Sequence, residues 1–148
     1  MRVVVQRVKN AACTVDNKIT GQINTGFLLF IGYKEGDTQI DSDKILKKVI
    51  GLRIFEDENG KMNRSLTDVN GEILAISQFT LYADCKHGNR PSFTKALGFN
   101  EANKKYMEFC SSLETNGFKV EKGVFGADMK ISILNDGPVT ILLDSDEL

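Results

Sequence analysis

The chain has 148 residues, of which 41% are hydrophobic and 26% are charged, and its formal net charge is −1. This length and composition predict one globular domain over residues 1–148 and exclude a disordered or fibrous protein. A nearly neutral chain cannot coat nucleic acid over its whole surface, so any contact with RNA must be confined to a local basic patch.

The cysteines and the single histidine argue against a metal centre. Cys13, Cys85 and Cys110 are odd in number and show no CxxC spacing, which indicates neither a disulfide framework nor a zinc site. No apolar run reaches the length of a membrane span, and no cleavage signal follows Met1. We therefore expect a soluble cytoplasmic protein that binds no metal and no membrane.

The N-terminal third predicts three strands and a helix. Residues 2–15 and 19–33 are rich in Val, Ile and Phe and are interrupted by Asp16-Asn17 and by Gly26, which indicates three strands joined by tight turns. Residues 37–51 then change to a helical period, with Asp37 or Thr38 as the N-cap and Gly51 as the stop. The predicted apolar face of this helix comprises Ile40, Ile45, Leu46, Val49 and Ile50.

The remaining chain predicts strands around a second helix. Asn59-Gly60 and Asn70-Gly71 are hairpin-type turn signals, and residues 72–83 form a strand that is apolar at every position from 73 to 76, so both of its faces should be covered. A polar loop leads to a helix from the N-cap Asn100 to Gly117. Three further strands are expected at 118–125, 129–134 and 139–144. The predicted apolar face of the second helix comprises Ala102, Tyr106, Phe109, Cys110 and Leu113.

This order of elements favours an α+β fold. We expect mainly antiparallel β-sheets in a barrel-like or sandwich arrangement, with the two helices packed outside, rather than a doubly wound parallel sheet.

The usual catalytic signatures are mostly absent. His87 lies in a polar loop beside Lys86, which is typical of a solvated residue. A nucleophilic pair of Cys85 and His87 would need a third, orienting group, and the sequence supplies none.

Two stretches are harder to explain as structure alone. In SQFTLYAD, an apolar strand ends in Ser77, Gln78 and Thr80, and a strand end that presents hydroxyls, an amide and backbone N–H groups is a candidate oxyanion hole. Ser77 and Thr80 would face opposite sides of the strand unless the chain bulges or ends there. In NDGPVT, Gly137-Pro138 is most simply a hairpin turn, although a cis Gly-Pro bond would turn a carbonyl outward rigidly.

In combination, these motifs resemble the D-aminoacyl-tRNA deacylase family. SQFTLYAD, GNRPSF, GVFGADM and NDGPVT occur in that order, with VQRV near the start and FEDENGKMN in the middle. The resemblance covers essentially the whole chain. It implies a homodimeric, metal-free, cofactor-free cytoplasmic hydrolase that cuts the ester between a D-amino acid and the terminal adenosine of tRNA.

The resemblance also implies roles for particular residues. Gly137 and Pro138 would be joined by a cis bond and enter the facing subunit's pocket as a chiral gate, whose carbonyls reject L-aminoacyl esters. Arg7 would support that gate. The scissile ester would be lined by Ser77, Gln78, Phe79 and Thr80, and the terminal adenosine by Phe125 and Met129.

The chemistry leaves alternatives open. Thr80 is either a nucleophile or a positioning group, and the second role leaves the 2′-hydroxyl of the tRNA to assist water. A gate that excludes by shape should accept D-amino acids with different side chains. It should also admit glycyl-tRNA, including glycyl esters mischarged on tRNA-Ala. Basic residues on the first helix and in the polar loop are either phosphate contacts or solvated faces: Lys44, Lys47, Lys48, Lys86 and Arg90. The rival functions are an editing deacylase for small L-aminoacyl-tRNA and a non-catalytic nucleic-acid-binding module.

Overall fold

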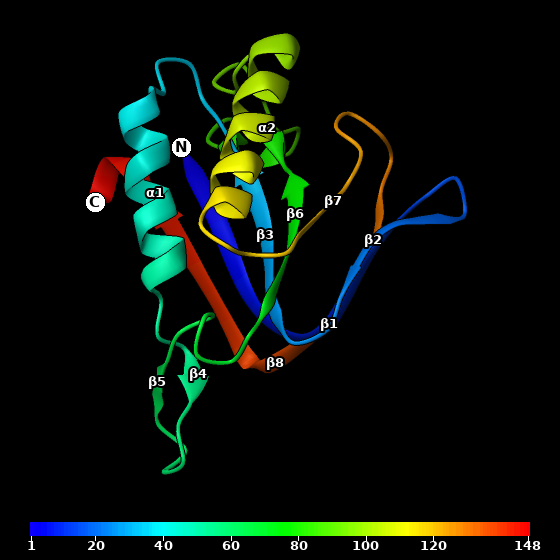
Figure 1. The fold of residues 1–148 in the computed structure, drawn as a ribbon. Helices are drawn as coiled ribbons and strands as arrows, with labels where there is room; N and C mark the ends of the chain where they lie inside the picture. Colours follow the sequence, from blue (N-terminus) through cyan, green and yellow to red (C-terminus); the bar gives the residue numbers. More distant parts are fainter.

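The longest strand pairing of the molecule joins the two ends of the chain. In the computed structural model, which describes residues 1–148, β1 (Arg2–Val15) pairs antiparallel with β8 (Lys130–Asp144) along nearly its whole length. The opposite edge of β1 pairs antiparallel with β3 (Gly26–Gly32) and β2 (Lys18–Ile23). β1 is therefore the strand around which the main sheet is assembled (Figure 1).

The sheet continues through two parallel pairings and curls into a nearly closed barrel. β3 pairs parallel with β6 (Glu72–Ser77), and β6 pairs parallel with β7 (Val120–Lys122). The curl brings β2 so close to β7 that a Cβ atom on Gly21 would lie 2.9 Å from the Lys122 carbonyl oxygen. The expected α+β fold with a mainly antiparallel, barrel-like sheet is confirmed, since the two parallel pairs are the exception.

Both helices pack outside the barrel, as expected. Figure 1 shows α1 (Gln39–Gly51) and α2 (Phe99–Thr115) on one side of the sheet. The Tyr106 hydroxyl of α2 donates a 2.8 Å hydrogen bond to the Ala75 carbonyl of β6. This buried hydrogen bond joins α2 to the sheet at β6.

The side chains of strand β6 pack in two separate hydrophobic clusters. Side chains alternate along a strand, and Ile73 and Ala75 accordingly join the cluster beneath the helices, whereas Leu74 and Ile76 join the cluster inside the barrel. The coverage of β6 on both faces is therefore confirmed. Both clusters are fully buried at these positions.

A small hairpin projects from one end of the molecule. β4 (Phe55–Glu56) pairs with β5 (Met62–Arg64) around the predicted Asn59-Gly60 turn. The second turn signal, Asn70-Gly71, does mark a turn, with Asn70 at φ 50°, but it leads into β6 and closes no hairpin.

Thr38, one of the two predicted N-caps of α1, is confirmed, whereas the exposure of Ile40 and the start of α2 differ from the predictions. The N-cap of α1 is Thr38, and the Asp41 carboxylate accepts 2.8 Å hydrogen bonds from the Thr38 backbone N–H and hydroxyl, which lower the pKa of Asp41 to about 2. Ile40 is 68% exposed, because its place on the buried face is taken by Ser42, which lies under the Tyr33 hydroxyl at 3.2 Å. α2 begins at Phe99 with Gly98 as its N-cap, not at Asn100.

The strand predictions for the C-terminal region were partly wrong. The strand expected over residues 72–83 ends at Ser77, and the short 3-10 helix η1 (Phe79–Tyr82) follows it. The three strands expected after α2 are two, because the strands expected at 129–134 and 139–144 form the single strand β8, which begins at Lys130. The hairpin turn expected at Gly137-Pro138 does not exist, since β1 is long enough to pair with both halves. A further short 3-10 helix, η2 (Ser145–Glu147), ends the chain.

Gly26 allows the close approach of β3 and β6. A Cβ atom there would lie 1.9 Å from the Glu72 carbonyl oxygen, so alanine must force the two strands apart. We expect Gly26→Ala to lower the free energy of unfolding by about 3 kcal/mol, the upper range for overpacking. Gly51→Ala is the matched control, because nothing lies within 4 Å of its Cβ position. Urea unfolding of both variants measures this, and equal stabilities would contradict the explanation.

Candidate functional site

A cavity of about 560 Å³ opens at the carboxyl end of β6. It is bounded by β6, η1, the start of α2 and the segment after β7. Five of the predicted site residues line it: Ser77, Gln78, Phe79, Phe125 and Met129. Sequence reasoning assigned these residues to an ester-binding and an adenosine-binding group, and the fold brings both groups to one cavity.

The polar wall of the cavity is formed where β6 turns into η1. Ser77 is the last residue of β6, and the chain then turns, so that Ser77 and Thr80 are no longer constrained to opposite faces of a strand. The Gln78 side-chain amide donates to the Thr80 hydroxyl oxygen at 2.5 Å. Thr80 does not line the cavity itself; it lies on the exposed side of the turn, held by this bond.

The backbone donors of this turn differ in their availability. The Gln78 N–H donates to the Ile31 carbonyl oxygen at 2.7 Å and is therefore already used inside the sheet. Phe79 and Thr80 begin η1, where a backbone N–H has no acceptor within the helix. An oxyanion at this wall would therefore be met by the donors of the first turn of η1 and not by Gln78.

No acid–base pair lies beside the Ser77 and Thr80 hydroxyls. Neither Ser77 nor Thr80 is hydrogen-bonded to a carboxylate or to the single histidine, His87, which is exposed. Asp128 is the one carboxylate that lines the cavity, and it forms an ion pair with Lys130 at 2.8 Å. No group of three or more His, Cys, Asp or Glu side chains is placed to hold a metal ion. The site offers neutral donors and acceptors in place of a charged catalytic group.

The opposite wall is aromatic. The Phe125 ring lies edge-on to the Phe99 ring, with centroids 5.0 Å apart, and tilted against the Tyr106 ring at 5.8 Å. The Met129 side chain borders the same region. Flat apolar walls of this kind suit a stacked base.

Sequence reasoning missed several residues that line the cavity. Phe93 lies in the segment between η1 and α2, Phe99 is the first residue of α2, and Ala102 and Tyr106 were assigned only to the core face of α2. The exposed fraction of Phe99, 62%, is the signal that distinguishes it from a core residue, and exposure is a property of the tertiary structure.

Gly137 and Pro138 occupy a bulge in β8, opposite Arg7. Gln6 of β1 pairs with Thr140 and Val8 pairs with Asn135, so four residues of β8, 136–139, face the single residue between them. The Gly137–Pro138 peptide bond is cis, and both residues are exposed. The bulge bends β8 near its middle (Figure 1).

Two side chains hold this bulge. The Asn135 amide donates to the Arg7 and Val139 carbonyl oxygens, each at 3.1 Å. The Arg7 guanidinium, only 4% exposed, donates to the Asp136 carbonyl oxygen at 3.0 Å and to the Ile54 carbonyl oxygen at 2.5 Å. Arg7 therefore connects the bulge to the chain that leads into the β4–β5 hairpin.

Gly137 itself has no room for a side chain. Its φ is +128°, and a Cβ atom there would lie 3.0 Å from an Arg7 guanidinium nitrogen. A glycine is required because L-residues rarely adopt this conformation.

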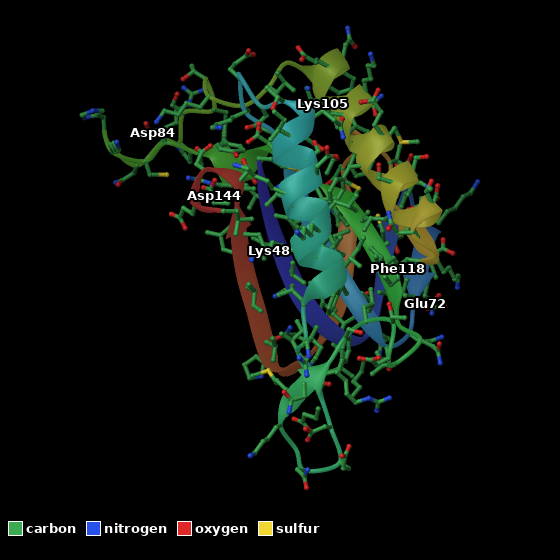
Figure 2. All side chains as sticks on the ribbon, turned by 60° about the vertical axis from the view of Figure 1, so that its left-hand side comes forward. Lys48, Glu72, Asp84, Lys105, Phe118 and Asp144 are labelled. Carbon is green, nitrogen blue, oxygen red and sulfur yellow. The ribbon has the colours of Figure 1, made fainter.

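Within one chain, the bulge and the cavity remain apart. No residue from 132 to 139 lines the cavity. Figures 1 and 2 show the bend of β8 at the end of the sheet nearest the β4–β5 hairpin, whereas Asp84, which follows η1, lies at the opposite end. The predicted site residues thus form two groups that a single protomer does not bring together.

Neither helix of the protein is long and apolar enough to cross a membrane.

The sequence matches a family model described as D-Tyr-tRNA(Tyr) deacylase over residues 4–144. A D-aminoacyl-tRNA deacylase from Clostridium tetani is 57% identical over 145 residues, which cover 98% of this chain and 97% of the relative. A D-aminoacyl-tRNA deacylase from Halothermothrix orenii is 54% identical over 147 residues, or 99% of each chain.

Solved structures have the same architecture. A c-Myc DNA unwinding element binding protein superposes with a TM-score of 0.90 at 39% identity, covering 97% of this chain and 98% of the other. A probable eukaryotic D-amino acid tRNA deacylase superposes with a TM-score of 0.83 at 17% identity, over 96% and 97% of the two chains, which shows the shared fold. The chain belongs to the D-Tyr-tRNA(Tyr) deacylase family.

Proposed function

We propose that this chain is a D-aminoacyl-tRNA deacylase, which hydrolyses the ester of D-aminoacyl-tRNA to the free D-amino acid and tRNA. The observation that carries the proposal is a single cavity with two unlike walls, a polar wall at Ser77 and Gln78 and an apolar wall that includes Phe125 and Met129. An aminoacyl group joined to a nucleoside has two corresponding parts, a polar ester and a flat base. The family membership supports the same substrate class.

The site acts by positioning and by stabilising negative charge. An aminoacyl ester is already activated, so a site with no acid–base partner beside its hydroxyls can still accelerate the hydrolysis of that ester. The backbone N–H group of Phe79, which lines the cavity, is the donor for the developing oxyanion, and one such donor is typically worth about 100- to 1,000-fold in rate. No metal or cofactor enters this mechanism, and the cytoplasm is its proposed location because tRNA is the substrate.

Thr80 is a positioning group in this mechanism, not the nucleophile. Its hydroxyl oxygen already accepts a hydrogen bond from Gln78, and no neighbouring base is available to take its proton. The 2′-hydroxyl of the terminal adenosine, next to the scissile ester, then assists the attacking water.

Substitution at Thr80 and removal of the 2′-hydroxyl separate these two roles. We expect Thr80→Val to lower kcat about tenfold, the effect of one neutral hydrogen bond. A substrate ending in 2′-deoxyadenosine should lose at least about 100-fold, as for a lost general acid–base group. Single-turnover hydrolysis measures both, with Thr94→Val as the control. A loss of about 10,000-fold in Thr80→Val would restore the nucleophile role.

Gly137 and Pro138 act as a chiral gate in the cavity of a second copy of the chain. Their bulge is exposed and held by Asn135 and Arg7, yet it lies far from the cavity of its own chain. Two apolar side chains of the same strand are strongly exposed, Leu134 at 54% and Leu142 at 60%, which supports a homodimer formed over β8. In that dimer, rigid backbone carbonyls exclude the side chain of an L-aminoacyl ester.

A gate of this kind excludes L-aminoacyl esters by shape and does not distinguish one D side chain from another. We expect D-alanyl-tRNA to be cleaved with a kcat/KM at least about 100-fold above that of L-alanyl-tRNA. Glycyl-tRNA, including glycyl esters mischarged on tRNA-Ala, should be cleaved as well, because glycine has no Cβ to clash. Parallel deacylation assays measure the three rates, and a resistant glycyl ester would contradict steric exclusion.

Arg7 supports the gate by holding the Asp136 and Ile54 carbonyls together. Lysine cannot span both oxygens with one ammonium group. We expect Arg7→Lys to lower the ratio of D-tyrosyl to L-tyrosyl hydrolysis about tenfold or more. The control is Arg53→Lys, an exposed arginine that also donates to a backbone carbonyl. The ratio is independent of the amount of folded enzyme, so an unchanged ratio would remove Arg7 from the gate.

Two rival functions make different predictions in the same assay. A non-catalytic nucleic-acid-binding module would bind RNA and release no amino acid, and the structurally similar c-Myc DNA unwinding element binding protein is itself named for binding DNA. An editing deacylase for small L-aminoacyl-tRNA would cleave L-alanyl-tRNA. Cleavage of D-tyrosyl-tRNA but not L-tyrosyl-tRNA is expected only from the proposed function.

A further inference from the structure

An exposed loop stands beside the cavity, and the mechanism above does not use it. Residues Cys85–Pro91, called the basic loop below, are all exposed. Two backbone hydrogen bonds between Asp84 and Ser92, of 2.7 and 2.9 Å, close its base. The Asp84 carboxylate also accepts from the Lys86 backbone N–H at 3.0 Å. Figure 2 shows the chain near Asp84 projecting from the body of the molecule.

The basic loop carries two positive charges, and the one carboxylate at its base, Asp84, does not balance both. It contains Lys86 and Arg90 and no Asp or Glu. Neither Lys86 nor Arg90 makes an ion pair, whereas Lys95, just outside the loop, pairs with Asp84 at 3.3 Å. Exposed cations on a fixed loop are suited to the phosphates of a nucleic acid.

The basic loop is joined directly to the wall of the cavity. Phe93, two residues beyond its end, lines the cavity and lies edge-on to Phe79, with ring centroids 5.0 Å apart. The chain then continues to Phe99, whose ring is 62% exposed at the other wall. One segment, from Asp84 to Phe99, thus carries both cations and exposed aromatic rings along the cavity. Cations combined with exposed aromatic rings are typical of surfaces that bind single-stranded nucleic acid.

We infer that the basic loop binds phosphates of the single-stranded RNA that precedes the terminal adenosine, with Lys86 and Arg90 as the contacts. This inference rests on the proposed function, because it places the terminal adenosine in the cavity. The basic loop is then a tRNA-binding element that holds the acceptor end while the ester is hydrolysed.

Helix α1 supplies the matched control. Lys47 and Lys48 are also exposed and make no ion pair, but no residue of α1 lines the cavity. Their charge equals that of Lys86 and Arg90, so a Lys47→Ala, Lys48→Ala variant changes the net charge of the protein by the same amount.

The test measures binding of an RNA hairpin that carries no amino acid and that reproduces the tRNA acceptor stem and its single-stranded 3′ end. Two lost phosphate contacts should reduce the slope of log affinity against log salt by about 1.4. Between about 50 mM and about 200 mM salt, wild type should lose about sevenfold more affinity than Lys86→Ala, Arg90→Ala. The α1 variant should keep the wild-type slope.

Hydrolysis of two substrates completes the test. The basic-loop variant should raise KM for D-tyrosyl-tRNA, and it should leave hydrolysis of D-tyrosyl-adenosine, which has no phosphate, at the wild-type rate. An unchanged salt slope, or an equal loss with D-tyrosyl-adenosine, would overturn the inference. Failure of wild type to cleave any D-aminoacyl ester would instead reject the proposed function, and the binding experiment would still decide whether the basic loop contacts RNA.

Discussion

The backbone pairing of β1 organises the whole molecule. One edge of this strand pairs with β8, and the other pairs with β3 and β2. These ladders place the later elements, because β3 carries β6, and β6 carries the turn at Ser77 and the contact with Tyr106. The cavity and the bulge are thus located by the same strand, at opposite ends of one sheet.

The bulge shows how a strand can present backbone instead of side chains. A regular ladder would use the carbonyls of residues 136–139 in pairing, but these four residues face Arg7 alone. The buried guanidinium satisfies the Asp136 carbonyl and adds an ion pair to its carboxylate at 3.5 Å. Removing one partner of such a buried arrangement is costly. Rigidity of this kind is what a filter that acts through its backbone requires.

The proposed chemistry follows from what the cavity lacks beside its hydroxyls. Without an acid–base partner for Ser77 or Thr80, the protein contributes orientation and backbone donors, and the substrate contributes its activated ester and its 2′-hydroxyl. In our proposal, recognition divides among three surfaces: the aromatic wall for the base, the gate for chirality, and the basic loop for the phosphates. Each surface can be altered by substitution without touching the turn at Ser77–Thr80.

Both helices and the three N-terminal strands could be predicted from residue order alone, because periodicity and turn residues are local properties. The family resemblance named the candidate site residues, and five of them line one cavity. Three features could not be predicted, since each depends on pairing with distant residues: the end of β6, the union of residues 130–134 and 139–144 in one strand, and the hydrogen bond from the Gln78 N–H to Ile31. The separation of Gly137 from Ser77 likewise emerges only in the folded chain. Side-chain chemistry can be read from residue order, whereas the partner of a backbone group depends on which strand lies beside it.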